Sequence, residues 1–182
     1  MADRLNQTGK FSLLLFFCLL VRLIPFRVPN VEPLTASLMP VSKSYCKFVG
    51  VFFAILSVVL YDLLTRTLGA HTFFTAGAFA LLAVLAGAYF ADRDASRANF
   101  VRFAIIGTLF FDASTGLVIG PLLFGQSLTA ALVGQIPFTA LHLLGNIVFA
   151  ATLSPAIHYL LTRELKQPVT VPITSSFNPK II

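Results

Sequence analysis

Long apolar segments, separated by short polar or proline-containing connections, run along the chain, and this pattern predicts helices throughout. Several of these segments approach the roughly 20 residues that a helix needs to cross ~30 Å of hydrocarbon. The expected helices lie at about 11–25, 34–39, 45–66, 71–90, 100–119 and from Pro137 to about 163, the last bent at Pro155. We therefore predict an all-α integral membrane protein, with a single bundle of six transmembrane helices over residues 1–165 and a polar, proline-containing cytoplasmic tail over 166–182.

The second predicted helix is short because prolines surround it. Pro25, Pro29 and Pro33 favour an extended connection, and Pro40 is expected to end the helix after Met39. A helix of this length cannot span the bilayer alone, so we expect a short, broken second crossing. Another uncharged stretch, LLFGQSLTAALVGQ, is expected to form a short helix along the membrane surface.

The last apolar segment carries a polar face. Within GQIPFTALHLLGN, the side chains of Gln135, Thr139, His142 and Asn146 recur at i, i+4, i+7 and i+11, which places them on one side of a helix. Polar residues inside a membrane are costly unless they meet partners or a cavity. One interpretation is a set of hydrogen bonds that hold helices together. The interpretation we favour is a wall that faces a ligand.

Composition supports the membrane assignment: 57% of the residues are hydrophobic and 11% are charged, and the mean hydropathy is +0.88. The basic residues predict the orientation, because they concentrate on the cytoplasmic side. With six crossings and a cytoplasmic N-terminus, ten of the 13 lie inside, and Arg22, Arg27 and Arg66 lie outside. We therefore expect both termini in the cytoplasm of a prokaryote and the bundle in its plasma membrane.

Several classes of function are disfavoured. No basic cluster sits on a soluble surface, so nucleic acid is not an expected partner. No nucleophile spacing, phosphate-binding glycine loop or cysteine cluster is present. His71, His142 and His158 lie on different helices or at opposite ends, which disfavours a metal site. We expect no cofactor, no catalytic residues and no enzymatic activity.

Several independent polar residues converge on the outer half of the predicted bundle. Asn30 and Glu32 fall in the first outer loop, and Asp62 and Asp112 lie near the outer ends of their helices. Together with the polar face, they predict a binding site that opens to the outside. Two alternatives remain for the aspartates. They could be caps or salt-bridge partners of nearby arginines, or an acid–base pair.

Two stretches carry a likeness to a known family. They are RLIPFRVPNVEPLTASLMP, in which a first helix runs into a proline-rich loop and a short helix, and GLVIGPLLFGQSLTAALVGQIPFTALHLLGN, a glycine-rich connection before a polar-faced last helix. In the order of these motifs and in its six-helix length, the chain resembles the substrate-binding S component of an energy-coupling factor (ECF) vitamin transporter, over about residues 11–165.

The resemblance implies a protein that captures a vitamin or related micronutrient from outside and has no ATPase of its own. Its implied partners are a transmembrane coupling subunit and two ATP-binding subunits. The first loop of such a protein closes over the ligand, which would place Asn30 and Glu32 at the lid. The complete set of expected substrate-binding residues is Asn30, Glu32, Asp62, Asp112, Gln135, Thr139, His142 and Asn146.

Two other classes of protein compete with this interpretation. A structural membrane scaffold of the rod-shape-determining type would have a similar size and helix count but would need no polar site. A small intramembrane enzyme would need a catalytic constellation that the sequence does not show. The charge of the ligand stays open, because the acidic residues suit a cationic or hydrogen-bond-donating ligand and Arg22 and Arg27 suit an anionic one.

Overall fold

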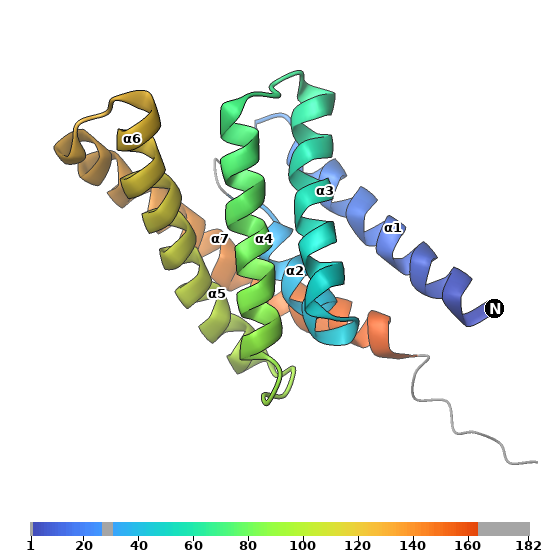
Figure 1. Cartoon of the computed structure of the whole chain (residues 1–182). Helices are drawn as coiled ribbons and strands as arrows, with labels where there is room; N and C mark the ends of the chain where they lie inside the picture. Colours follow the sequence, from blue (N-terminus) through green and yellow to red (C-terminus); the bar gives the residue numbers. More distant parts are fainter. Residues whose placement is uncertain (1, 27–30, 164–182) are drawn as a thin grey trace, which may run out of the picture.

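The structure, a computed structural model, describes residues 2–26 and 31–163, and these residues are helical wherever they form regular structure. The elements in chain order are α1 (Ala2–Leu23), α2 (Leu34–Ser44), α3 (Lys47–Thr65), α4 (Ala70–Tyr89), α5 (Arg97–Asp112), a π-helical segment η1 (Ala113–Ile119), α6 (Gly120–Phe124) and α7 (Leu128–Thr162) (Figure 1). Asn30 and the predicted tail 166–182 lie outside the described residues.

Within residues 2–26 and 31–163, four stretches of helix are long and apolar enough to cross a membrane, which supports a helical membrane protein. They are α3, α4, the continuous helix Arg97–Phe124 formed by α5, η1 and α6, and α7. The expected count of six crossings is not reached by this criterion. The helix α1 begins with a polar stretch, and α2 has 11 residues, about 16 Å at ~1.5 Å per residue.

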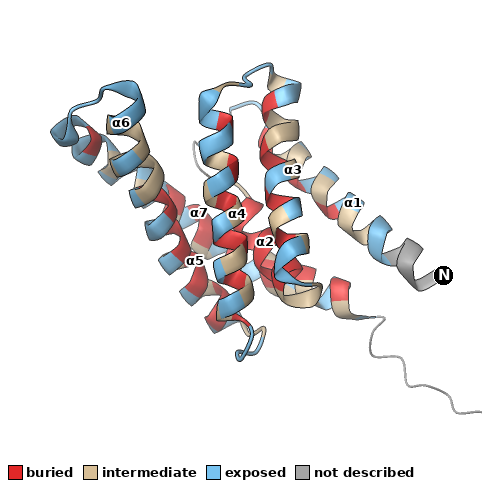
Figure 2. Ribbon diagram, viewed as in Figure 1, coloured by how far each residue is buried: buried red, intermediate tan, exposed pale blue. Residues whose placement is uncertain are grey.

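The short helix α2 lies at the centre of the bundle. Its residues from Leu34 to Ser42 are all buried, and it packs against α3, α4, α5 and α7 (Figures 1 and 2). The prediction that Pro40 ends this helix is wrong, because Pro40 lies inside it. Proline removes the N–H that would bond the carbonyl of Ala36, four residues earlier. The hydroxyl of Ser154 on α7 donates to that carbonyl at 2.7 Å instead.

Four other predictions about the helices are corrected. The first helix starts at Ala2 rather than near residue 11, and the fifth continues through η1 to Phe124. The stretch expected to form a separate surface helix is divided between α6 and the start of α7. The last helix begins at Leu128, where the Ser127 hydroxyl accepts a hydrogen bond from the Ala130 N–H, so Pro137 lies inside α7.

The outward faces of the long helices are apolar. Large hydrophobic side chains on α3, α4 and α7, such as Phe52, Phe73 and Ile136, are more than half exposed in the isolated chain. Figure 2 shows exposed faces along these helices, while buried positions face inward. Lipid tails would cover such surfaces without cost, which is the arrangement expected of a bundle embedded in a bilayer.

Candidate functional site

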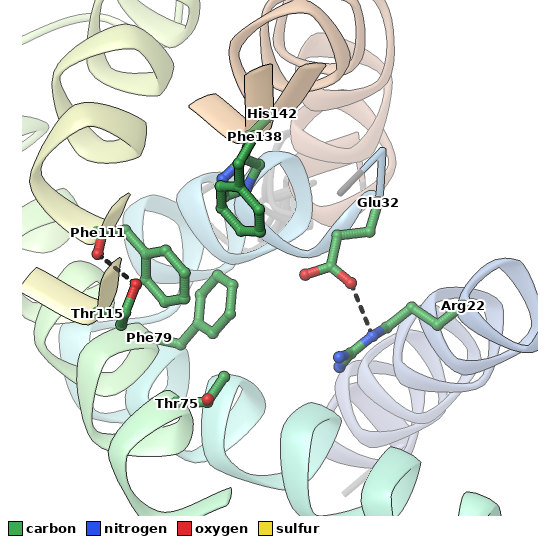
Figure 3. Close-up of a pocket in the computed structure, with 8 residues that line it drawn as sticks. All are labelled: Arg22, Glu32, Thr75, Phe79, Phe111, Thr115, Phe138 and His142. Atoms are coloured by element: carbon green, nitrogen blue, oxygen red, sulfur yellow. Dashed lines mark hydrogen bonds and ion pairs between the residues drawn. The ribbon is translucent and has the colours of Figure 1, made fainter. Parts of the chain in front are cut away.

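A cavity of about 320 Å³ opens between α1, α4, α7, the helix formed by α5 and η1, and the segment before α2. Figure 3 shows its eight lining side chains around an open space. They are Arg22, Glu32, Thr75, Phe79, Phe111, Thr115, Phe138 and His142. The volume lies near the lower end of the ~300–1,000 Å³ that small-molecule sites span. Glu32 and His142, two of the predicted binding residues, therefore face the same space.

One polar wall of the cavity is an ion pair. Arg22 Nε lies 2.9 Å from Glu32 Oε2 (Figure 3). Arg22 also donates through Nη1 to the Ser57 carbonyl at 2.9 Å and places its guanidinium 4.2 Å from the centre of the Tyr61 ring. It thereby links α1, α3 and the segment that carries Glu32. A guanidinium is well suited to this position because its planar group can pair with a carboxylate and stack on an aromatic ring at once.

The segment that carries Glu32 rests on α7 at a glycine. A Cβ added to Gly145 would lie 3.1 Å from the Cα of Val31, which is closer than a side chain and a backbone normally pack. The absence of a side chain at Gly145 therefore lets residue 31 lie against α7. Because Val31 precedes Glu32 directly, this contact positions Glu32 beside the cavity.

The opposite polar wall is a buried carboxylate–imidazole pair. His142 Nδ1 and Asp112 Oδ1 are 2.7 Å apart, and the two residues are 3% and 1% exposed. A carboxylate can only accept, so Nδ1 of His142 is the donor when Asp112 is ionised. Asp112 stands behind His142 rather than in the cavity lining. The predicted residues Asp112 and His142 are thus brought together, with His142 in contact with the cavity.

The remaining wall is aromatic. The Phe79 and Phe111 rings lie 4.3 Å apart between centroids, and the Phe111 and Phe138 rings stand nearly perpendicular to the His142 ring at centroid distances of 5.8 and 5.9 Å. Thr75 and Thr115 stand at the border of this wall (Figure 3). The cavity can therefore hold a small flat molecule between aromatic faces on one side and charged groups on the other.

The rest of the polar face on α7 makes contacts within the protein. Gln135 Nε2 donates to the Thr139 hydroxyl at 3.1 Å, and Gln135 occupies the space that a side chain at Gly116 of η1 would need. Asn146 Nδ2 donates to the Thr108 hydroxyl on α5 at 2.7 Å, and Asn146 is 1% exposed. Gln135, Thr139 and Asn146 are not among the residues that line the cavity. For Asn146 the interhelical interpretation fits the geometry best.

The Asn146–Thr108 contact gives a testable prediction. Asn146→Leu should lower the free energy of unfolding by about 1 kcal/mol, the size measured for hydrogen bonds between membrane helices. The double variant Thr108→Val/Asn146→Leu should regain most of that loss, because both polar partners are gone. Unfolding in detergent with a denaturant would measure both. A ligand affinity that falls while stability is unchanged would contradict the structural role of Asn146.

Asp62 lies apart from the cavity, at the turn between α3 and α4. Its Oδ2 accepts from the Thr72 hydroxyl at 2.7 Å and lies 3.6 Å from His71 Nε2, while the Thr72 hydroxyl also accepts from the Gly69 N–H at 3.1 Å. Asp62 therefore acts as a hairpin clamp at this turn. It does not line the cavity described above, and among the described residues its partners are Thr72 and His71 rather than an arginine. The charge of Arg22 is matched by Glu32 instead.

The hairpin clamp predicts a local effect. Thr72→Val should cost about 1 kcal/mol of stability, since it strands the Asp62 carboxylate and removes the bond to Gly69. It should leave the affinity of the cavity for any ligand unchanged. A melting curve compared with a binding curve of the same variant would show this. Loss of affinity at normal stability would place Asp62 in the site after all.

Several residues of the cavity were missed at the level of sequence. Arg22 was considered as a group for an anionic ligand or as a partner of an aspartate, but not as the partner of Glu32, although its position before a proline-rich loop with Glu32 is a signal for that pair. Phe79, Phe111 and Phe138 could not be singled out among 19 phenylalanines. Thr75 and Thr115 carry no sequence signal, because threonine is common in membrane helices as a hydroxyl that bonds its own backbone.

Within residues 2–26 and 31–163, no group of three or more histidine, cysteine or acidic side chains could hold a metal ion. The fold and the site together describe a helical membrane protein with a small polar and aromatic cavity. No protein-family model matches the chain, and no match was found among curated proteins or solved structures.

Proposed function

We propose that the protein is the membrane-embedded substrate-binding subunit of an ECF-type importer, which captures a vitamin-like molecule. The observation that carries the proposal is the shared cavity of Glu32 and His142, two residues 110 positions apart that the folded chain brings to one space. A substrate-binding subunit needs such a pocket, with a few polar groups among apolar ones. A coupling subunit and two ATP-binding subunits would supply the energy of transport.

The proposal includes an orientation. The N- and C-termini face the cytoplasm of a prokaryote and the α3–α4 turn faces outside, in accordance with the distribution of basic residues. The turn between α2 and α3, which carries the exposed Cys46, then faces inside.

Cysteine labelling tests the orientation. In intact cells, Ser127→Cys should react with a membrane-impermeant thiol reagent, because Ser127 precedes α7 on the outer side. The natural Cys46 provides the matched internal control and should react only after the membrane is permeabilised. Labelling of Cys46 in intact wild-type cells would reverse the orientation.

The binding function is tested by what the purified protein carries. Small molecules released by heat from detergent-purified protein would be identified by mass spectrometry for wild type, Phe138→Trp and Phe48→Trp. Phe138 lines the cavity, whereas Phe48 is 71% exposed on α3 and serves as the control. One compound should accompany wild type and Phe48→Trp and be depleted in Phe138→Trp, since the larger ring fills the cavity. Equal content in all three proteins would contradict the proposal.

The transport arrangement has its own test. Reconstituted alone in liposomes, the protein should bind but not accumulate the compound, and accumulation should require the coupling subunit, the ATPases and ATP. Uptake against a gradient by the protein alone would refute this part.

A structural scaffold is the second candidate, and one observation favours it. The polar face of α7 is largely occupied by contacts within the bundle, from Thr108 to Asn146 and from Asp112 to His142. A scaffold would need these links and no ligand. The mass-spectrometric comparison separates the candidates, because a scaffold carries no compound whose presence depends on Phe138.

A further inference from the structure

When the imidazole of His142 is neutral, the charged groups around the cavity do not balance. Glu32 is matched by Arg22 at 2.9 Å, and Arg22 is further engaged by the Ser57 carbonyl and the Tyr61 ring. Asp112 has only the imidazole of His142 on Oδ1, and its buried Oδ2 has no hydrogen-bond partner within the described part of the chain. With a neutral imidazole, one negative charge is left over beside the cavity.

The Asp112–His142 pair also decides which kind of atom His142 presents to a ligand. Because Nδ1 donates to the carboxylate, the other ring nitrogen, Nε2, carries the lone pair and accepts. Because His142 lines the cavity, Nε2 is the hydrogen-bond acceptor that its imidazole can offer to a ligand, while the Asp112 carboxylate bonds the other nitrogen of the same ring. A ligand N–H that binds there would benefit from both, and more strongly if the ligand is positively charged, since the low dielectric of the site weakens screening.

The aromatic wall adds a shape requirement. Phe79 and Phe111 form a tilted pair, and Phe138 contacts the His142 ring at a centroid distance of 5.9 Å. Aromatic faces attract cations as well as flat rings. The volume of about 320 Å³ limits the occupant to a small molecule. Arg22 does not favour an anion, because its guanidinium is already engaged by a carboxylate, a carbonyl and a ring.

From these observations we propose that the cavity takes a small, flat nitrogen heterocycle that carries one positive charge and an N–H group. The N–H donates to Nε2 of His142, the ring lies against Phe79 and Phe111, and Asp112 compensates the charge. The inference rests on the proposed binding function and narrows it to one chemical class of substrate.

Three probes on one bicyclic skeleton test the class by isothermal titration of the detergent-purified protein at neutral pH. They are 4-aminoquinoline, which is flat and cationic, quinoline-4-carboxylate, which is flat and anionic, and decahydroquinoline, which is cationic but saturated. The first should bind at least tenfold more tightly than either of the others. Two variants test whether the charge of Asp112 causes this preference. Asp112→Asn keeps an acceptor for His142 Nδ1 but removes the charge. Asp62→Asn is the control, because it makes the same charge change at the α3–α4 turn, away from the cavity.

In the expected result, Asp112→Asn weakens 4-aminoquinoline binding at least tenfold and Asp62→Asn leaves it within twofold of wild type. Tighter binding of the carboxylate, or equal weakening by both variants, would overturn the inference. If none of the probes binds, the inference also fails, and the proposed function then depends on the compound released by heat. If the compound released by heat depends on Phe138 but belongs to another chemical class, the proposed binding function stands and only the proposed substrate class is rejected.

Discussion

Replacing Arg22 by methionine is expected to cost about 2–3 kcal/mol of stability, somewhat below the ~3–5 kcal/mol typical of breaking a fully buried ion pair. Methionine keeps the apolar stem but leaves Glu32 without its cation and removes the additional hydrogen bond to the Ser57 carbonyl. The cost is reduced because Glu32, at 13% exposure, borders a cavity that can admit water. Thermal unfolding of the detergent-purified protein without ligand would show the loss as a lower Tm.

The chain offers a closely matched control for Arg22. Arg93 also donates to a backbone carbonyl, that of Tyr89 at 2.8 Å, and places its guanidinium 4.3 Å from an aromatic ring centre, but it does so in an exposed position. Arg93→Met should therefore change the Tm little. The double variant Arg22→Met/Glu32→Gln should recover part of the loss, because the stranded charge is gone. Equal Tm values for Arg22→Met and Arg93→Met would show that the buried pair contributes nothing.

The second large effect concerns Asp112. Asp112→Ala should lower stability by about 1–3 kcal/mol, the usual cost of leaving a buried donor, here His142 Nδ1–H, without an acceptor. Asp112→Asn should fold as well as wild type or better, since an amide oxygen can accept the same bond and the buried Oδ2 no longer carries charge. Both variants should lose ligand affinity.

A melting curve beside a binding curve separates these expectations. An Asp112→Asn protein with a normal Tm and weak binding would mean that the carboxylate is retained for function at some cost to stability, as is common in binding sites. If Asp112→Asn instead destabilised the protein as much as Asp112→Ala and bound ligand normally, Asp112 would be a structural residue and His142 an interhelical link.

Much of the architecture was predictable from local pattern. Apolar segments of membrane length identified α3, α4, α5 and α7, because hydrocarbon demands continuous hydrophobic helix. The helix periodicity of Gln135 to Asn146 predicted a polar face, of which His142 and Asn146 are buried in the bundle and Gln135 and Thr139 are half-buried. Boundaries near proline were less reliable. Pro40 was expected to end a helix and Pro137 to begin one, yet both lie inside helices. The Ser154 hydroxyl bonds the Ala36 carbonyl that Pro40 leaves without a backbone donor.

The sequence by itself determined that the chain is a helical membrane protein. It also determined which polar groups are available, namely the polar face from Gln135 to Asn146, Glu32 in the first loop, and Asp62 and Asp112 on helices. Only the tertiary structure decided which of these groups meet. Asp62 and Asp112 each come directly after an aromatic residue in the sequence. Asp62 nevertheless bonds Thr72 across the α3–α4 turn, whereas Asp112 on α5 bonds His142 on α7. Contacts of this kind depend on how distant helices approach and rotate, which the composition of a single segment does not specify. The same reason explains Arg22, whose partner Glu32 follows Val31, the residue that lies against Gly145 of α7.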